Sequence, residues 1–345
     1  MFVTIVVLNY NYEKFVGDAI RSALAQTYAS LEVVVVDNGS TDHSLGVIET
    51  FSHRVKLVRV PTNIGQGEGY NRGFEAARGD WIVWLDADDV LDTDAIATCM
   101  ALVQSDTAKV QYPLRCIDAD GRPLPGVLPY LRHQGDVLPL IRTFGHYGGP
   151  PGSGNLYRRE ALRPYFPVNP DDWPIGTDTV PFITAPFHGR VIDTGRTLGS
   201  YRLHRQAVEA IPGYRGNYSK SIASEVRLNY KSRDLVFRML RERSGLLVET
   251  PLLTLPAHVR NRVVSWRSAR EQHPFKTDGA RSLQRLMSDS LAACPGYSFL
   301  DRLCIRAWTA GALFAPMSIA SRLMRLTRSN TLFESILRLG RRGLG

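Results

Sequence analysis

Four strand-like runs rich in β-branched residues, most of them apolar, are each followed by a segment with helical spacing, and they limit most strongly how this chain can fold. The runs occupy residues 2–8, 32–36, 55–60 and 81–85. Runs that are apolar throughout are typical of strands buried on both faces of a sheet. Helices are expected over residues 15–25, 44–51, 67–77 and 94–104. The repeated units predict an α/β fold with a mostly parallel central sheet flanked by helices.

Polar side chains stand where three of these strands end. They are Asn9, Asp37 and, within Asp86-Ala87-Asp88-Asp89, Asp86 and Asp88. Ligands of such sheets bind beyond the carboxyl ends of the strands, so we expect one shared site. Alternate carboxylates there can supply oxygen ligands to a divalent cation, which then neutralises a diphosphate. The plainer interpretations are helix caps for the aspartates and a local turn at Asp37.

Two other nucleotide-binding motifs are disfavoured. The glycines of Gly65-Gln66-Gly67-Glu68-Gly69 follow a strand and open a helix, in loose likeness to a dinucleotide-binding fingerprint. However, Pro61-Thr62-Asn63 intervenes after the strand, the loop belongs to the third strand–helix unit, and Glu68 would face a pyrophosphate. No GxxxxGK[ST] sequence occurs in the chain, which excludes a P-loop.

Beyond residue 104 the pattern is mixed. Strands are expected over residues 108–116, 191–193 and 199–204, and a tight turn over 118–121. Residues 145–154 hold five glycines and two prolines, which is typical of a flexible loop that shapes an acceptor pocket, or of a plain linker. Gly176-Thr177-Asp178-Thr179 opens a helix, where Asp178 would be an N-cap on the plainer interpretation.

An ordered set of short motifs carries a resemblance over about residues 2–206. The motifs are Val7-Leu8-Asn9-Tyr10-Asn11, residues 32–42 ending in Asp37-Asn38-Gly39-Ser40-Thr41-Asp42, Asn63-Ile64-Gly65, Asn71-Arg72-Gly73, Ala77-Arg78-Gly79-Asp80, Leu85-Asp86-Ala87-Asp88-Asp89, Thr177-Asp178 and Tyr201-Arg202-Leu203-His204. This set resembles glycosyltransferase family 2. The resemblance implies a GT-A nucleotide-sugar-binding fold and an inverting, metal-dependent sugar transfer, with bacterial surface polysaccharide or glycolipid as the setting.

The resemblance also implies roles by position. Tyr10 would pack on the nucleobase and Asp37 would bond its edge. Asp86 would hold the ribose or the water shell of the metal, Asp88 would ligate Mn²⁺ or Mg²⁺, and Asp178 would be the general base. The remaining expected site residues are His204 at the metal or diphosphate, Asn9, Gly65 and Asn71 at the nucleotide, and Gly154, Asn155 and Thr177 at the acceptor.

The chain departs from the family pattern at three positions. Asn38 replaces a usual Asp, Tyr70 replaces an Arg that often precedes the Asn-x-Gly, and Thr177 replaces a Glu before the catalytic Asp. The metal and base carboxylates remain, so we expect an active transferase with a nucleotide-sugar donor, a UDP-sugar first, and a saccharide or lipid-linked acceptor. The alternatives are a catalytically inactive nucleotide-sugar-binding or scaffold protein and a sugar-phosphate nucleotidylyltransferase. The second would need a glycine- and lysine-rich N-terminal loop, and residues 9–14 hold one lysine.

Charge divides the chain near residue 211. Residues 1–211 hold 19 basic and 24 acidic side chains, whereas residues 212–345 hold 23 basic and 9 acidic ones. Such asymmetry is typical of separate roles. We therefore expect a catalytic domain over 1–211, with a nucleotide-binding half at 1–105 and an acceptor half at 106–211, and a basic, mainly helical region over 212–345.

The basic region has two interpretations. Helices are expected over residues 234–241 and 319–326, and an apolar stretch over 307–321. Ile319, Leu323 and Leu326 share one helical face, with Arg322, Arg325 and Arg328 around it. This arrangement suits an anionic membrane surface, where lipid-linked acceptors are found, or else a solvated helical cap on the catalytic domain. Charge alone would suit nucleic acid as well, but no reader module accompanies it, so no nucleic-acid partner is expected.

The sequence also gives an expectation for location. The stretch 307–321 is shorter than the roughly 20 apolar residues that span a bilayer. No basic segment precedes the first apolar run, and the four cysteines lack metal-site spacing, which is typical of thiols in a reducing compartment. We expect a cytoplasmic protein, peripheral to the inner face of the plasma membrane at most.

Overall fold

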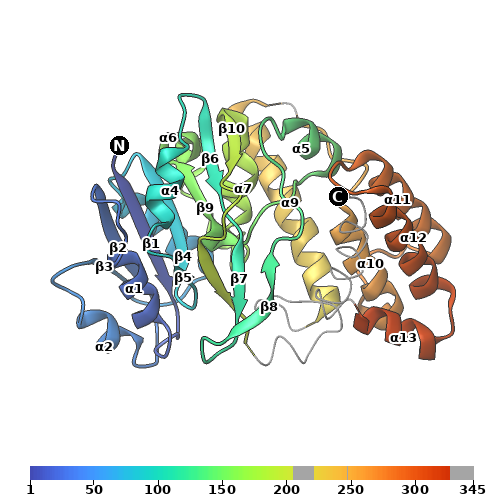
Figure 1. Ribbon diagram of the computed structural model, residues 1–345, viewed down its shortest axis with the longest axis horizontal. Coiled ribbons are helices and arrows are strands. Elements are labelled where there is room, and N and C mark those ends of the chain that lie inside the picture. The colour runs from blue at the N-terminus through green and yellow to red at the C-terminus, as the bar shows by residue number, and fades with distance from the viewer. Residues whose placement is uncertain (205–220, 247, 327–345) are drawn as a thin grey trace.

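The computed structural model describes residues 1–204, 221–246 and 248–326 of the chain (Figure 1). The strands and their covering helices form one part of the molecule, and helices α10 to α13 form the other. Helix α9 lies between the two parts (Figure 1). The expected α/β architecture with a helical C-terminal region is therefore confirmed.

The central sheet has seven strands in the order β10-β6-β9-β4-β1-β2-β3. Their bounds are β1 Val3–Asn9, β2 Leu31–Asn38, β3 Lys56–Val60, β4 Trp81–Asp86, β6 Thr107–Gln111, β9 Asn155–Arg158 and β10 Arg190–Asp193. Strand β1 pairs in parallel with β2 and β4. Strand β9 runs antiparallel between β4 and β6. The sheet is thus mostly parallel, as expected.

Helices follow the first four strands of the sheet. They are α1 Val16–Leu24, α2 Ser44–Glu49, α3 Gln66–Ala76 and, after the short strand β5 Val90–Leu91, α4 Ala95–Ala101. Alternate residues of β1 belong to different cores: Val6 packs in one, whereas Ile5 and Val7 pack in the other. Because successive strand side chains point to opposite faces, the central strands are buried on both faces, which explains their continuous apolar runs.

The strand expected over residues 108–116 is wrong as a single element. It is two strands, β6 in the central sheet and β7 Leu114–Ile117 in a second sheet of order β5-β11-β7-β8. The other new strands of that sheet are β8 Pro123–Leu128 and β11 Gly199–Arg202. The break falls at Tyr112 and Pro113. Proline has no N–H to donate to a ladder, so it favours the exit from the central sheet.

The C-terminal helices have two kinds of packing. Helix α9, Ile222–Ser244, buries Val236, Phe237 and Leu240 in a core that also holds Val180 and Ile183 of the α/β part. Helices α10 Pro256–Ser268, α11 Ala280–Ala293, α12 Phe299–Phe314 and α13 Met317–Leu326 share a core of their own. The helices expected over 234–241 and 319–326 lie within α9 and α13. The boundary expected at residue 211, Arg328, and the side chains of Arg325 and Leu326 lie outside the described residues.

None of the helices within the described ranges combines the length and apolar character needed to cross a membrane.

Candidate active site

The ends of β1, β2 and β4 come together at one edge of the sheet. Asn9 lies opposite Asp37, and Leu8 lies opposite Asp86 in the strand register. The amide Nδ2 of Asn9 donates to Asp37 Oδ1 at 2.8 Å and to Ser40 Oγ at 3.0 Å. Asp37 Oδ2 also accepts a bond from the Ser40 N–H at 3.2 Å. Both buried side chains are therefore held rigidly at the strand ends.

A cleft of about 190 Å³ opens at this edge. It is lined by Leu8, Asn9, Tyr10, Tyr12, Asn38, Asn63, Gln66, Gly69, Asp86, Ala87, Asp88, Pro174 and Ile175. The Tyr10 side chain stands at its rim and is 41% exposed. The expected meeting of Asn9, Asp86 and Asp88 at one site is thus observed, with Asp37 bonded directly behind Asn9.

The aspartate loop after β4 is held from several elements. Oδ2 of Asp88 lies 2.8 Å from Nε2 of His204. The buried Arg202 donates from Nε to the Asp88 carbonyl at 2.8 Å, and its backbone N–H donates to Asp89 Oδ1 at 3.0 Å. The Asp86 N–H donates to Ser153 Oγ at 3.1 Å. These bonds hold the loop that carries the carboxylates in place.

Negative charge accumulates around this loop. Burial and the neighbouring Asp88 and Asp86 raise the pKa of Asp89 well above its usual range. Burial together with Asp88 and Asp86 also raises the pKa of Tyr12, whose ring packs 5.7 Å from that of His204. A cation bound at the cleft would relieve this charge.

Asp178 lies directly before helix α7, Thr179–Thr184, and close to Asp86. A Cβ atom built on Gly152 would lie 3.5 Å from Asp178 Cβ, 3.6 Å from the Tyr70 hydroxyl and 3.8 Å from Asp86 Oδ2. Gly152 is therefore surrounded by all three side chains. Burial raises the pKa of Asp178, and burial followed by the charges of Asp178 and Asp86 raises the pKa of the Tyr70 hydroxyl. The expected base and the strand-end carboxylates thus share one site.

The glycine-rich loop over residues 145–154 is tied down next to that site. The Tyr112 hydroxyl donates to the Ser153 carbonyl at 2.8 Å. Nδ2 of Asn155 donates to the carbonyls of Pro151 at 2.7 Å and Gly152 at 3.1 Å. Asn155 supports the loop from behind. Its expected contact with an acceptor therefore stays a prediction.

Two other expected acceptor residues are also packed within the wall. Gly154 fits against Pro150 and the Tyr112 carbonyl, with no room for a Cβ atom. Thr177 is fully buried, and its N–H donates to Gln66 Oε1 at 2.9 Å. These contacts give both residues a part in shaping the site, and their acceptor role stays a prediction.

Two expected nucleotide residues anchor a segment of the acceptor half. The Asn71 amide pairs with the Val168 backbone through Nδ2 at 2.9 Å and Oδ1 at 2.8 Å. Gly65 has φ +116°, and a Cβ atom there would lie 2.8 Å from Pro174 Cα. The Asn38 amide donates to the Gly65 carbonyl at 2.9 Å, which an aspartate could not do. These contacts hold Pro174 in the cleft wall.

Some residues that orient the site were not singled out by sequence reasoning. Ser153 and Tyr112 bond across 67 and 41 positions of the chain, and no local pattern marks them. Arg202 was noted within the Tyr201-Arg202-Leu203-His204 motif without a role. Its burial beside Asp88 and Asp89 assigns it to positioning of the aspartate loop.

The donor set of the cleft suits a cation shared with a substrate. Over the part of the chain that the structure describes, no group of three or more His, Cys, Asp or Glu is arranged to hold a metal ion. The cleft itself offers the carboxylates of Asp86 and Asp88. Mg²⁺ is usually held by one or two carboxylates together with substrate phosphates and waters, so these residues fit such an ion.

The family model described as "Glycosyl transferase family 2" matches residues 4–166. These residues form a glycosyltransferase family 2 domain. The resemblance inferred from the motifs is therefore confirmed. The matched residues include Gly152 and all of the cleft lining except Pro174 and Ile175, whereas Asp178 and His204 lie beyond them.

Two curated relatives show the range of similarity. An uncharacterized glycosyltransferase of Nostoc sp. is 34% identical over 215 residues, which are 59% of this chain and 65% of that protein. The succinoglycan biosynthesis protein ExoO of Rhizobium meliloti is 37% identical over 124 residues, which are 35% of this chain and 36% of that protein. The matches thus span less than two thirds of either relative's length.

A solved structure extends the likeness to the C-terminal helices. Residues 1–349 of TarS from S. aureus superpose with a TM-score of 0.52, covering 99% of this chain and 92% of that chain. The identity is 17%, so this likeness concerns the fold. Together with the family 2 domain, it identifies the expected GT-A fold.

Proposed function

We propose that this protein is an inverting glycosyltransferase that moves a sugar from a nucleotide-diphosphate donor to a hydroxyl group of a saccharide or lipid-linked acceptor. The single observation that carries the proposal is the approach of Asp178 and Asp86 to Gly152 from different elements. One carboxylate can then serve the acceptor and the other the donor. ExoO and the chondroitin synthase of Escherichia coli are named for polysaccharide synthesis, which supports a surface polysaccharide or glycolipid as the setting.

The cleft at the strand ends is the proposed donor site. The exposed Tyr10 ring is available to pack on a nucleobase, and the rigidly held Asp37 can accept further bonds at its edge. Asn9, Gly65 and Asn71 shape this cleft through the contacts described above. TarS has been crystallised with UDP and with UDP-GlcNAc, which supports a UDP-sugar as the donor.

Asp86 and Asp88 are the residues that would hold Mn²⁺ or Mg²⁺, with His204 orienting Asp88. When bound, the ion would stabilise the negative charge of the departing nucleoside diphosphate. The chain's own contribution is the fixed position of the two carboxylates, which Arg202 and Ser153 secure through the backbone.

Asp178 is the proposed general base. The attacking hydroxyl loses its proton to the Asp178 carboxylate while its oxygen bonds to the anomeric carbon and the bond to the diphosphate breaks. A raised pKa makes Asp178 a stronger base than an exposed carboxylate, and such help is typically worth about 10²–10⁴-fold in rate. An inactive scaffold protein would have no need for the carboxylates of Asp86, Asp88 and Asp178 at one site.

The proposed donor site is tested by thermal unfolding with UDP, GDP, dTDP and CMP, each with Mn²⁺ or with EDTA. We expect UDP with Mn²⁺ to raise the melting temperature most. A ligand at about 100 times its Kd stabilises the folded state by about 2.7 kcal/mol, so binding of a nucleotide gives a measurable shift. If none of the four nucleotides shifts the melting temperature, the proposal is wrong.

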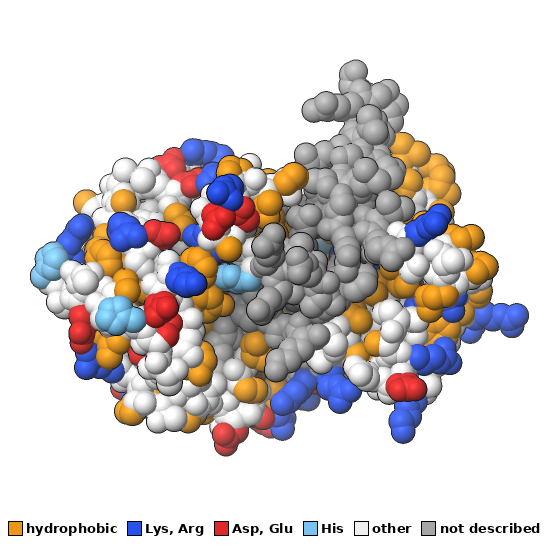
Figure 2. Space-filling view, turned by 90° about the horizontal axis from the view of Figure 1, so that it is seen from below, with side chains coloured by type: hydrophobic (Ala, Val, Ile, Leu, Met, Phe, Trp, Pro, Cys, Tyr) orange, Lys and Arg blue, Asp and Glu red, His pale blue; other side chains and the backbone are white. Residues whose placement is uncertain are grey.

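We also propose contact with an anionic membrane through the C-terminal helices. Helices α12 and α13 expose a row of large apolar side chains: Phe299 at 79%, Leu303 at 54%, Phe314 at 57%, Met317 at 48% and Ile319 at 51%. Arg306 and Arg322 are exposed on the same helices. Figure 2 shows hydrophobic and basic side chains together on this part of the surface. Apolar residues flanked by arginines suit a leaflet of anionic lipid.

This face differs from the one expected from the sequence. Trp308 is buried, and its Nε1 donates to the Leu323 carbonyl at 3.0 Å. The Leu323 side chain packs against Gly311 of α12. The lipid-facing residues are therefore those of the exposed row. Co-sedimentation with phosphatidylglycerol vesicles at low salt tests it: the double variant Leu303→Asp, Phe314→Asp should stay in the supernatant, and equal sedimentation of both proteins would rule the contact out.

A further inference from the structure

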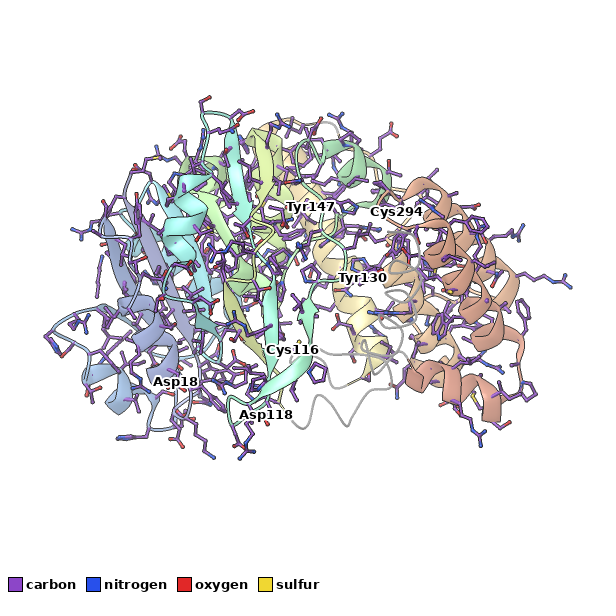
Figure 3. The ribbon with its side chains drawn as sticks, in the orientation of Figure 1. Asp18, Cys116, Asp118, Tyr130, Tyr147 and Cys294 are labelled. Carbon is purple, nitrogen blue, oxygen red and sulfur yellow. The ribbon has the colours of Figure 1, made fainter. Side chains whose placement is uncertain are left out.

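A second cavity, of about 270 Å³, lies between the family 2 domain and the C-terminal helices. Its walls come from Leu128 at the end of β8 with residues 129–131, residues 146–149 of the glycine-rich loop, and residues 255–258 and 260 at the start of α10. Ile305 and Trp308 of α12 and Tyr297, two residues before that helix, complete the lining. In Figure 3, Tyr130 and Tyr147 lie between the sheet and the C-terminal helices.

Six aromatic or imidazole rings line the cavity among leucines, prolines, glycines and an arginine. Tyr130, Tyr147, Tyr297 and Trp308 line it, together with His146 and His258. The two imidazole rings lie 5.2 Å apart. Burial, the neighbouring His258 and nearby cations lower the pKa of His146 to about 3. Burial together with Arg233 and Arg260 lowers the pKa of His258 to about 4. Both imidazoles are therefore neutral at physiological pH, and the cavity offers flat apolar faces with a few polar atoms.

Packing contacts link the wall of the cavity to the site of the proposed base. The rings of His146 and Tyr147 stack on Phe182, at centroid distances of 4.8 and 4.4 Å. Phe182 stands one turn along α7 from Asp178, and its N–H donates to the Asp178 carbonyl at 3.2 Å. One helical turn rises by about 5 Å. The loop that supplies His146 and Tyr147 then continues to Gly152, beside Asp178 and Asp86.

The lining chemistry favours a sugar ring over a lipid tail. The C–H faces of a pyranose can pack against the aromatic rings while its hydroxyls bond to the imidazoles of His146 and His258. The Tyr147 hydroxyl already accepts a bond from Lys109 Nζ and donates to the Phe182 carbonyl, and an aliphatic chain would supply no hydrogen bond to the imidazoles. The volume is close to the lower end of small-molecule sites, which suits one or two sugar rings.

We propose that this cavity is an acceptor subsite that holds a pyranose ring at some remove from the reacting hydroxyl. The proposal rests on the proposed function, because it takes Asp178 as the base that activates the acceptor. It gives the C-terminal helices a direct part in acceptor selection, since α10, α12 and the segments just before them supply half of the lining residues.

The test fills the cavity without removing a core side chain. Ala257 lines the cavity from the first turn of α10 and is exposed, so Ala257→Trp places an indole in the opening. The matched control is Ala307→Trp, because Ala307 is an exposed alanine of α12 that does not line the cavity. Saturation-transfer NMR is recorded with cellobiose, lactose and chitobiose as probes. At least one disaccharide should give a signal with the wild type and Ala307→Trp that is lost with Ala257→Trp.

A second variant guards against a folding defect of Ala257→Trp. Tyr130→Ala removes one aromatic wall from a loop and should lose the same signal. An undiminished signal in both cavity variants, or no signal from any of the three disaccharides with the wild type, overturns the subsite. UDP-induced thermal shifts are measured on the same samples and should be equal in all of them. Disaccharide binding without any nucleotide-induced shift would overturn the proposed function and leave the cavity as a sugar-binding site.

Discussion

Nε2 of His204 lies 2.8 Å from Oδ2 of Asp88, although the two residues are 116 positions apart in the chain. The contact joins the end of β11 to the aspartate loop after β4. The His204 ring also packs between Tyr12 and Phe15, at centroid distances of 5.7 and 5.3 Å. The acceptor half of the chain thereby fixes the orientation of a carboxylate in the nucleotide half.

This contact predicts different effects for the two partners. Asp88→Asn should abolish the dependence of UDP binding on Mn²⁺, because it removes a carboxylate proposed to hold the ion. His204→Ala should keep that dependence but weaken Mn²⁺ binding by about 10–100-fold, the usual cost of losing a residue that orients a ligand. Calorimetric titration of UDP at several Mn²⁺ concentrations measures both. Identical titrations for wild type and Asp88→Asn would contradict the assignment.

Asp178→Asn should reduce kcat by about 10²–10⁴-fold, because the amide cannot accept the acceptor's proton. UDP binding should be unchanged, since the nucleotide cleft does not include Asp178. Steady-state transfer kinetics and nucleotide titration together separate loss of the base from loss of the fold. Turnover at the wild-type rate would refute the role of Asp178.

The raised pKa of Asp178 predicts a pH profile. Activity requires the carboxylate, so kcat/KM of the wild type should fall as the pH drops through a pKa above the usual range of aspartate. For stability the sign is opposite: the buried charge destabilises the fold above the pKa of the unfolded chain, and this cost vanishes at lower pH. Asp178→Asn should therefore melt higher than wild type at pH 7, with the gap closing towards pH 3.

Gly65 and Gly69 form a matched pair for a stability test. Gly65→Ala should cost about 1–3 kcal/mol or more, because φ is +116° and the new Cβ would lie 2.8 Å from Pro174 Cα. At Gly69 the nearest atoms to a new Cβ are 3.6 Å away, and alanine is favoured over glycine within helix α3 by about 0.5–1 kcal/mol. Urea unfolding of both variants measures the contrast. Equal urea midpoints for the two variants would show that residues 173–175 do not restrict the space at Gly65.

The buried Lys109 predicts a pH-dependent cost. Its Nζ donates to the Tyr147 hydroxyl at 2.8 Å and lies 3.7 Å from the centroid of the Phe182 ring. Burial lowers the pKa of this amine well below its usual range, although Asp193 acts in the opposite direction. The folded state therefore binds fewer protons than the unfolded chain, and stability should fall as the pH drops from about 10 towards the lowered value. In Lys109→Met this slope should be reduced, as urea unfolding at pH 6 and pH 9 would measure.

Much of the first half of the fold could be predicted from the sequence. Continuous apolar runs such as residues 32–36 predict strands buried on both faces, and polar residues at their ends predict the edge where a ligand binds. These signals are local, because the burial of a strand or helix is visible in the pattern of apolar residues along that element. The meeting of Asn9, Asp86 and Asp88 then follows from the geometry of a parallel sheet.

Other features depended on contacts between distant parts of the chain. The passage from one sheet to the other at Pro113 interrupts a run that looks continuous in sequence, because apolar residues suit either sheet. Asn71 and Gly65 were assigned to the nucleotide, whereas their direct contacts are with Val168 and Pro174. A short motif indicates which residue type a position requires, but it does not indicate which residue or ligand that side chain contacts.

The sequence by itself determined the order of strands and helices in the first half of the chain, the polar strand ends and the basic character of the C-terminal region. Each of these features depends on residues that are close together in the sequence. Only the tertiary structure decided that Asp178 approaches Asp86 across Gly152, that Arg202 supports the aspartate loop, and that rings from the loop and from α12 enclose a cavity. Those arrangements bring together residues from separate elements, and their energies depend on distances that exist only after the chain has folded.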